Sequence, residues 1–161
     1  MNKKIENFKE SMHLSMLENY KKDEYLAPVF FIFMSDGLFG LTKIPKDFLY
    51  SENKHILADL IKNIISSNPL IVAAGIIMEA YGAQISANTE MAKLILNGDI
   101  EMKDIKEKKE IIIMIFSTPQ KEEFIAYYVD DATKTVGERF SEDGGGIFGG
   151  LFSHLFAWNK N

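Results

Sequence analysis

The run Ile111-Ile112-Ile113-Met114-Ile115-Phe116 is the stretch of sequence that decides the fold. Six consecutive apolar residues, most of them β-branched, are typical of a strand that is covered on both faces. Thr118-Pro119-Gln120 then breaks the pattern, and Phe124-Ile125-Ala126-Tyr127-Tyr128-Val129 follows as a second β-prone run. We therefore predict a central antiparallel hairpin. A last short strand is expected around residues 134–140.

A second hairpin is predicted closer to the N-terminus. Val29-Phe30-Phe31-Ile32-Phe33-Met34 is apolar on both alternating faces, and Leu38-Phe39-Gly40-Leu41-Thr42-Lys43-Ile44 follows it almost at once. Asp36-Gly37 lies between the two runs. Because Asp-Gly tolerates the positive φ values of a two-residue hairpin turn, we expect these strands to pair antiparallel.

Residues 70–81, LIVAAGIIMEAY, are apolar at almost every position. Periodicity cannot separate a buried strand from a buried helix in such a run. The β-branched residues and Gly75 favour a strand. A helix would instead turn residues 52–81 into a helical hairpin and remove one strand from the sheet.

Three segments have helical patterns. Residues 3–22 carry the apolar stripe Ile5, Phe8, Met12 and Leu17 opposite the polar residues Lys3, Lys4, Glu6, Asn7, Lys9 and Glu10. After Ser51 as N-cap, a helix is predicted from the apolar positions Ile56, Leu57, Leu60, Ile61, Ile64 and Ile65. A short helix over residues 88–97, with Asn88 as cap, completes the set. The chain is predicted to be an α+β domain with a mainly antiparallel sheet of five to six strands and packed helices.

The composition fits one ordinary domain. The 161 residues include 18 Lys+Arg and 23 Asp+Glu, a net charge of −5, and 47% of them are hydrophobic. The absence of cysteine excludes disulfides, thiolate metal sites and cysteine nucleophiles. The start of the chain lacks a signal-peptide pattern and no run approaches ~20 apolar residues, so we expect a cytoplasmic protein. Arg139 is the only arginine, so no nucleic-acid partner is expected.

Several of these features together resemble a known group of proteins. They are the opening helix, the apolar run 29–34 with its Asp-Gly turn, Met78-Glu79-Ala80-Tyr81 and the strand Glu110-Ile111-Ile112-Ile113-Met114. In this combination the chain resembles a loosely defined family of small uncharacterised bacterial and phage α+β proteins, over roughly residues 1–130. The resemblance implies the fold and carries no activity, cofactor or site residue.

The residues that could carry chemistry are scattered. His13, His55 and His154 lie in three separate segments without metal-ligand spacing, and we expect no metal and no cofactor. We predict that His13, at the border of the first helix, is partly exposed. Residues 144–149 match G-x-G-x-x-G in letters, but only twelve residues follow, so we expect no βαβ unit here. We read the acidic pairs Asp130-Asp131 and Glu142-Asp143 as turn residues, not cation ligands.

Glu79 is the single candidate for a catalytic residue because it interrupts a long apolar run. Burial would raise the pKa of its carboxyl group toward neutrality, as a general acid or base requires. The alternative is a strand-end glutamate at the edge of the sheet. An enzyme or ligand-binding site would use Glu79 together with Tyr81 and Asp36 around one end of the sheet.

The C-terminal segment is the most unusual part of the chain. After a glycine hinge at 144–146, a helical grid places these apolar residues on one face: Ile147, Phe148, Leu151, Phe152, Leu155, Phe156 and, near the end, Trp158. We predict a single domain over 1–143 followed by an amphipathic C-terminal helix within 144–161. Its apolar face could dock on its own sheet, on another protein or on a membrane surface. A single lysine, Lys160, disfavours the membrane.

Two functions follow from these patterns. The first is a non-enzymatic protein-interaction or regulatory module, encoded by a phage or mobile element. It would bind a protein partner or form a homo-oligomer through hydrophobic surface that includes the seven C-terminal residues. The second is a small enzyme or ligand-binding domain with its acid/base site near Glu79. The lack of assembled catalytic groups favours the first.

Overall fold

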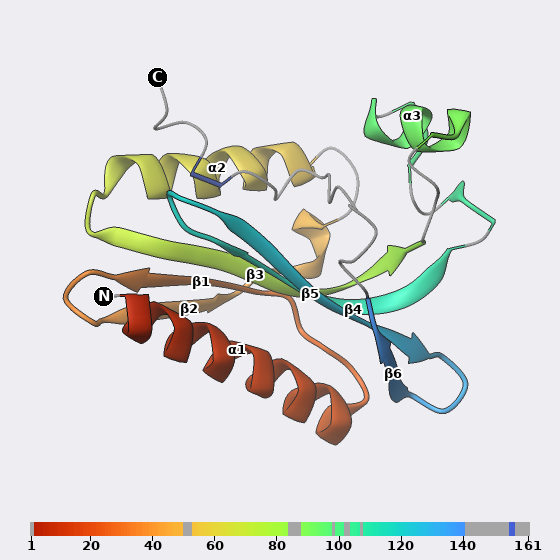
Figure 1. Ribbon diagram of the computed structural model, residues 1–161, viewed down its shortest axis with the longest axis horizontal. Coiled ribbons are helices and arrows are strands. Elements are labelled where there is room, and N and C mark those ends of the chain that lie inside the picture. The colour runs from red at the N-terminus through yellow and green to blue at the C-terminus, as the bar shows by residue number, and fades with distance from the viewer. Residues whose placement is uncertain are drawn as a thin grey trace.

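A computed structural model describes residues 2–49, 53–83, 88–97, 99–101, 104–106, 108–140 and 155–156. The described residues form an antiparallel six-stranded sheet in the order β2-β1-β3-β4-β5-β6 (Figure 1). Its strands are β1 (Val29–Met34), β2 (Phe39–Lys43), β3 (Ile71–Gly82), β4 (Lys109–Ser117), β5 (Glu122–Asp130) and β6 (Thr135–Arg139). The predicted α+β architecture is confirmed, with β4 and β5 as the hairpin that the isoleucine run predicts.

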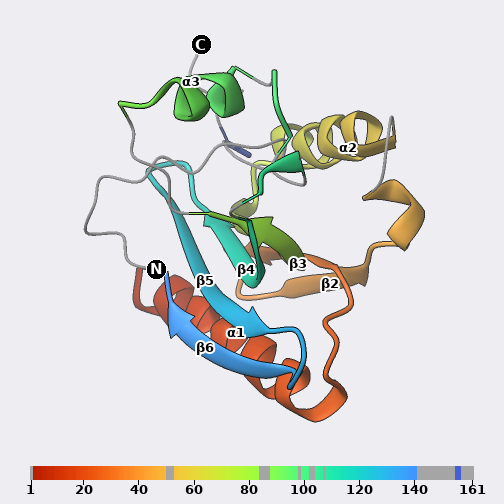
Figure 2. The same ribbon diagram turned by 90° about the vertical axis from the view of Figure 1, so that its right-hand side faces the viewer.

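Both faces of the sheet are covered, which explains why β4 is apolar at consecutive positions. Helix α1 (Asn2–Asp23) lies on one face and α2 (Asn53–Ser67) on the other (Figure 2). Alternate β4 residues point to opposite sides. Ile111, Ile113 and Ile115 enter the α2-side core, whereas Ile112, Met114 and Phe116 enter the α1-side core.

The long apolar run 70–81 is a strand, as Gly75 and the β-branched residues predict. β3 pairs with β1 on one side and with β4 on the other, so it is an interior strand. Seven of its twelve residues are buried, all but one of them between Ile71 and Ile77. The alternative helical hairpin over 52–81 is therefore excluded.

The turn between β1 and β2 has three residues and not the predicted two. The Gly37 N–H donates to the Met34 carbonyl at 2.9 Å, and the Met34 N–H donates to the Leu38 carbonyl at 2.8 Å. Only Gly37 has a positive φ, +91°, whereas a two-residue type I′ turn needs positive φ at both central residues. Asp36 instead accepts a hydrogen bond from the Leu38 N–H through its carboxylate, at 3.0 Å.

The remaining elements are short. A 3-10 helix, η1 (Lys46–Phe48), follows β2, and α3 (Glu90–Leu96) lies between β3 and β4. The N-cap of α3 is Thr89 and not the predicted Asn88, because the Thr89 hydroxyl accepts a hydrogen bond from the Ala92 N–H at 3.2 Å. The predicted cap Ser51 lies outside the described residues, and so does the predicted C-terminal helix apart from Leu155 and Phe156. Within the described residues, no helix has the length and apolar character needed to cross a membrane.

Candidate functional site

Two of the seven predicted partner-binding residues lie inside the protein. Leu155 and Phe156 are 1% and 5% exposed and belong to the α2-side core, together with Ala58, Ile61 and Ile65 of α2. These two side chains are therefore covered by the protein's own core. The other five, Ile147, Phe148, Leu151, Phe152 and Trp158, lie outside the described residues, and their role in binding stays a prediction.

Glu79 is exposed near the end of β3. Its Oε1 atom accepts a hydrogen bond from the Leu26 backbone N–H at 3.3 Å, which ties the α1–β1 connection to the sheet. The catalytic hypothesis needed a buried carboxylate, and the structure places this one at the surface. Glu79 does lie near a strand end, as the alternative interpretation predicts, although β3 itself is an interior strand.

The structure does not bring the three residues of the enzyme hypothesis together. Tyr81 follows Glu79 on the same face of β3 and is exposed, with the Lys108 ammonium 5.1 Å from its ring centroid. Asp36 lies at the other end, because Met34 is paired with Ile71, the first residue of β3. The eight residues from that pair to Glu79 span roughly 25 Å. The prediction that Asp36 joins them is wrong.

The prediction that His13 is partly exposed is also wrong. Its side chain is buried between α1 and β5, where Nε2 lies 2.8 Å from the Tyr127 hydroxyl oxygen and Nδ1 lies 3.5 Å from the Glu10 carboxylate. His55 is exposed on α2, and His154 lies outside the described residues. Among the residues that the structure describes, no three His, Asp or Glu side chains are grouped so that they could hold a metal ion.

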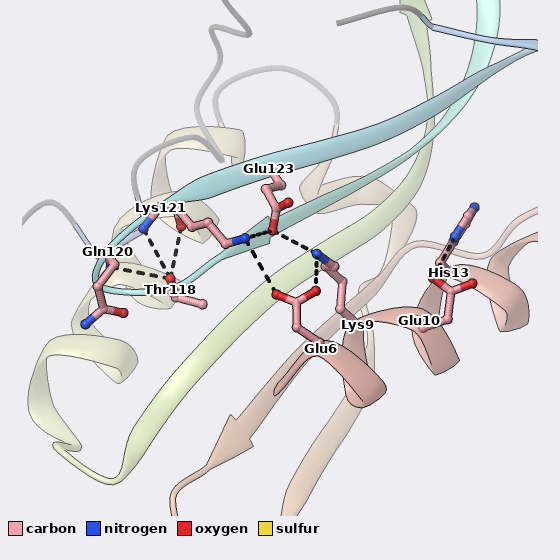
Figure 3. Close-up of polar contacts among 8 residues, drawn as sticks. All are labelled: Glu6, Lys9, Glu10, His13, Thr118, Gln120, Lys121 and Glu123. Atoms are coloured by element: carbon pink, nitrogen blue, oxygen red, sulfur yellow. Dashed lines mark hydrogen bonds and ion pairs between the residues drawn. The ribbon is translucent and has the colours of Figure 1, made fainter. Parts of the chain in front are cut away.

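A charge network of four side chains joins α1 to β5 and to the turn before it (Figure 3). Lys9 is at its centre, with its ammonium 2.6 Å from a Glu6 oxygen and 3.0 Å from a Glu123 oxygen. Lys121 closes the network at 3.1 Å from Glu123 and 3.6 Å from Glu6. Helical periodicity places Lys9 on the solvent side of α1, but only 13% of its side chain is exposed.

The network compensates for placing a lysine against the sheet. Burial disfavours the charged ammonium of Lys9, but the hydrogen bonds to Glu6 and Glu123 outweigh it and raise the pKa of Lys9. The hydrogen bond to Lys9 in turn lowers the pKa of Glu6. Both shifts favour the charged pair in the folded state. Its contribution to stability is lost as pH falls through the Glu6 pKa or rises through the Lys9 pKa.

Replacing Lys9 by methionine is expected to lower the free energy of unfolding by about 1–3 kcal/mol at pH 7, because partly buried Glu123 loses its closest partner. Urea unfolding followed by circular dichroism measures the change. Lys93→Met is the matched control, since its ion pair with Glu90 is exposed and should contribute less than about 0.5 kcal/mol. Equal effects of the two substitutions would show that the Lys9 network is only a surface feature.

A second cluster of charged side chains consists of Glu110, Asp131 and Lys134, whose charges act on Tyr20 near the C-terminal end of α1. Burial raises the pKa of Glu110, and the neighbouring Asp131 carboxylate raises it further. Lys134 forms an ion pair with Asp131 and lowers the pKa of Asp131. Asp130 serves the turn itself, because its Oδ1 accepts from the N–H groups of Ala132 and Thr133. The predicted turn role of Asp130-Asp131 is confirmed, and Glu142-Asp143 lies outside the described residues.

Replacing Glu110 by glutamine is expected to stabilise the protein at pH 7 by less than about 1 kcal/mol, because the group is partly solvated. A carboxyl whose pKa is raised by folding contributes stability below its unfolded pKa and loses it as pH rises through the folded value. The gain should therefore vanish as pH falls to about 4. Urea unfolding of both proteins from pH 4 to 8 checks this, and a gain that is constant with pH would contradict it.

Two clusters of apolar side chains remain at the surface. The α2 stripe consists of Ile56, Leu60 and Ile64, which are exposed on the side of α2 away from the core. The hairpin patch consists of Leu38, Phe39 and Leu41 on the second strand of the β1–β2 hairpin and the residue before it. The apolar spacing of residues 56–65 predicted the helix but not that half of these positions would face outward.

Comparisons of the chain with protein-family models, with curated proteins and with solved structures found no match.

Proposed function

We propose that this protein is a non-enzymatic interaction module that binds a protein partner, or a second copy of itself, through exposed apolar side chains. The observation that carries the proposal is the pair of surfaces just described, the α2 stripe and the hairpin patch. A helix on the surface of a domain normally presents polar residues to water, and single exposed leucines are common. Grouped exposed apolar side chains are instead typical of binding surfaces.

The α2 stripe has the spacing of a helix-recognition surface. Ile56, Leu60 and Ile64 follow one another at intervals of four residues and therefore lie along one line of the helix. Ala58, Ile61 and Ile65 fill the opposite, core-facing side. The stripe is therefore not needed for the fold. This separation makes it possible to change the surface without changing the core.

Fewer residues of the C-terminal segment are available for binding than the sequence suggests. Leu155 and Phe156 are committed to the α2-side core, so a partner could reach them only by displacing them. A role of the remaining apolar residues, from Ile147 to Trp158, stays part of the proposal. The surfaces that support it within the described residues are the α2 stripe and the hairpin patch.

The proposal is tested with three variants that each introduce one lysine at an exposed position: Leu41→Lys, Leu60→Lys and, as a polar control, Asn63→Lys. Light scattering reports self-association, and affinity purification from native extract followed by mass spectrometry reports partners. We expect at least one leucine variant to lose an association that Asn63→Lys keeps. If all three variants behave like the wild-type protein in both measurements, the proposal is wrong.

The enzyme alternative gains no support from the described residues. Its acid/base candidate is exposed and hydrogen-bonded to a backbone N–H, and Asp36 is at the opposite end of the sheet.

A further inference from the structure

We infer that the protein forms a two-fold dimer in which β2 pairs antiparallel with β2 of a second copy, so that two sheets become one continuous sheet. The inference rests on the proposed function, because it selects self-association through the hairpin patch. It identifies the binding partner as a second copy of the chain and gives the register of the two β2 strands, both of which the proposed function leaves open.

Among the described residues, β2 is the terminal strand of the sheet, so one hydrogen-bonding edge of its backbone pairs with no other described strand. The Met34 N–H donates to Leu38, and the Ile44 N–H donates to Pro28. Antiparallel strands alternate between inward and outward peptide groups. The N–H and C=O groups of Phe39, Leu41 and Lys43 therefore point away from β1.

The two edges of the sheet differ in how they are protected. Edge strands usually carry charges, prolines or irregularities that prevent pairing with another chain. β6 carries Glu138 and Arg139 and pairs irregularly with β5. β2 is regular along its whole length, and Lys43 is its only charge. We therefore expect pairing at β2 and not at β6, which gives a closed dimer and not a fibre.

The positions of Leu41 and Lys43 select one register. With Leu41 opposite Leu41 of the second copy, Phe39 meets Lys43 of the second copy, and all three outward-facing residues find partners. A lysine beside an aromatic ring is favourable, and the lysine stem packs on the ring. A register shifted to place Lys43 opposite its own copy would bring like charges together. Charge therefore favours the register centred on Leu41.

The side chains that this pairing would cover include Phe39 and Leu41 of the hairpin patch. Phe39 and Leu41 lie on the α1 face of β2, where the ring of Phe39 is 5.7 Å from that of Phe8. Pairing would extend this aromatic cluster across the two-fold axis. A five-residue pairing is at the small end of specific interfaces, about 1,000 Å² in total, so we expect a dissociation constant of roughly micromolar size.

Sedimentation velocity over a range of about 1–200 μM tests the dimer, with two matched variants. Leu41 and Leu60 are both 53% exposed, so Leu41→Lys and Leu60→Lys make the same change on different surfaces. We expect Leu41→Lys to weaken dimerisation at least tenfold and Leu60→Lys to leave it unchanged. The reverse result would overturn the β2 interface but leave the proposed function standing. If the wild-type protein is a monomer that binds a partner protein, the β2 interface is wrong and the proposed function stands. If it is a monomer that binds nothing, both the β2 interface and the proposed function are wrong.

A cross-linking experiment tests the register without depending on the stability of a charged variant. The chain has no cysteine, so Leu41→Cys introduces a single thiol. Directly opposed residues in a hydrogen-bonded antiparallel pair have Cα atoms about 5.5 Å apart, within the range of a disulfide. Mild oxidation should yield a covalent dimer of Leu41→Cys within minutes and little of Leu60→Cys. Equal cross-linking of both variants would overturn the register.

Discussion

Replacing Gly75 by alanine is expected to lower the free energy of unfolding by about 4 kcal/mol or more, which is a large fraction of the roughly 5–15 kcal/mol that stabilises an ordinary domain. A Cβ atom at this position would lie 2.1 Å from the Ile115 carbonyl oxygen and 2.4 Å from Cζ of Phe31. The first contact is with backbone in the middle of the sheet, so it cannot be relieved by a side-chain rotation. Either β3 or β4 would have to move.

The contact with Phe31 arises because two aromatic rings pack across the glycine. Gly75 is paired with Phe31 of β1 on one side and with Phe116 of β4 on the other. The rings of Phe31 and Phe116 stack with their centroids 6.0 Å apart, and both are buried in the α1-side core. The missing side chain at residue 75 leaves the space that they fill.

Urea unfolding measured by circular dichroism provides the test, with Gly40→Ala as the control. At Gly40 a Cβ atom would meet only the side chain of Ile32, at 3.3 Å, and that side chain can adjust. We expect a change below about 1 kcal/mol for the control. Similar losses for the two alanine variants would mean that the absence of a side chain at residue 75 is not needed for packing.

The strands and main helices could be predicted because their signals are local. The apolar run at Val29–Met34 coincides with β1, and the isoleucine run lies within β4. In β3, Gly75 in a β-branched context correctly favoured a strand, and the pairing with Phe31 and Phe116 now gives that glycine a physical reason. Hydrophobic patterns identify such elements because the spacing of apolar residues within an element reflects which of its faces are buried.

The polar contacts between α1 and the sheet could not be predicted, because their partners are distant in sequence. Lys9 is stabilised by Glu123 and His13 by Tyr127, each 114 residues further along the chain. Helix periodicity alone assigned Lys9 to the polar side of α1. The spacing of Glu6, Lys9, Glu10 and His13 at the border of the apolar stripe was the available signal. It marks one helix face but does not name the strand that the face meets.

The same limitation applied to the C-terminal residues, where an apolar pattern showed that something must cover them but not what. For Leu155 and Phe156 the cover is the α2-side core. Replacing Leu155 by alanine is expected to lower the free energy of unfolding by about 2–5 kcal/mol, and Phe156→Ala by about 3–5 kcal/mol. Leu14→Ala, at an exposed leucine of α1, should change it by less than about 0.5 kcal/mol.

This prediction decides how the C-terminal segment can be tested for binding. A chain that ends at residue 143 would lose Leu155 and Phe156 and expose the core beneath α2, so lost binding by that truncation would not separate a missing surface from a destabilised domain. Urea unfolding of the two alanine variants and of the truncated chain measures the difference. If the two alanine variants and the truncated chain all unfold at the wild-type midpoint, Leu155 and Phe156 do not stabilise the core. The whole C-terminal segment could then serve as a binding surface. If they unfold earlier, as we expect, substitutions in the hairpin patch and the α2 stripe are the cleaner probes of partner binding.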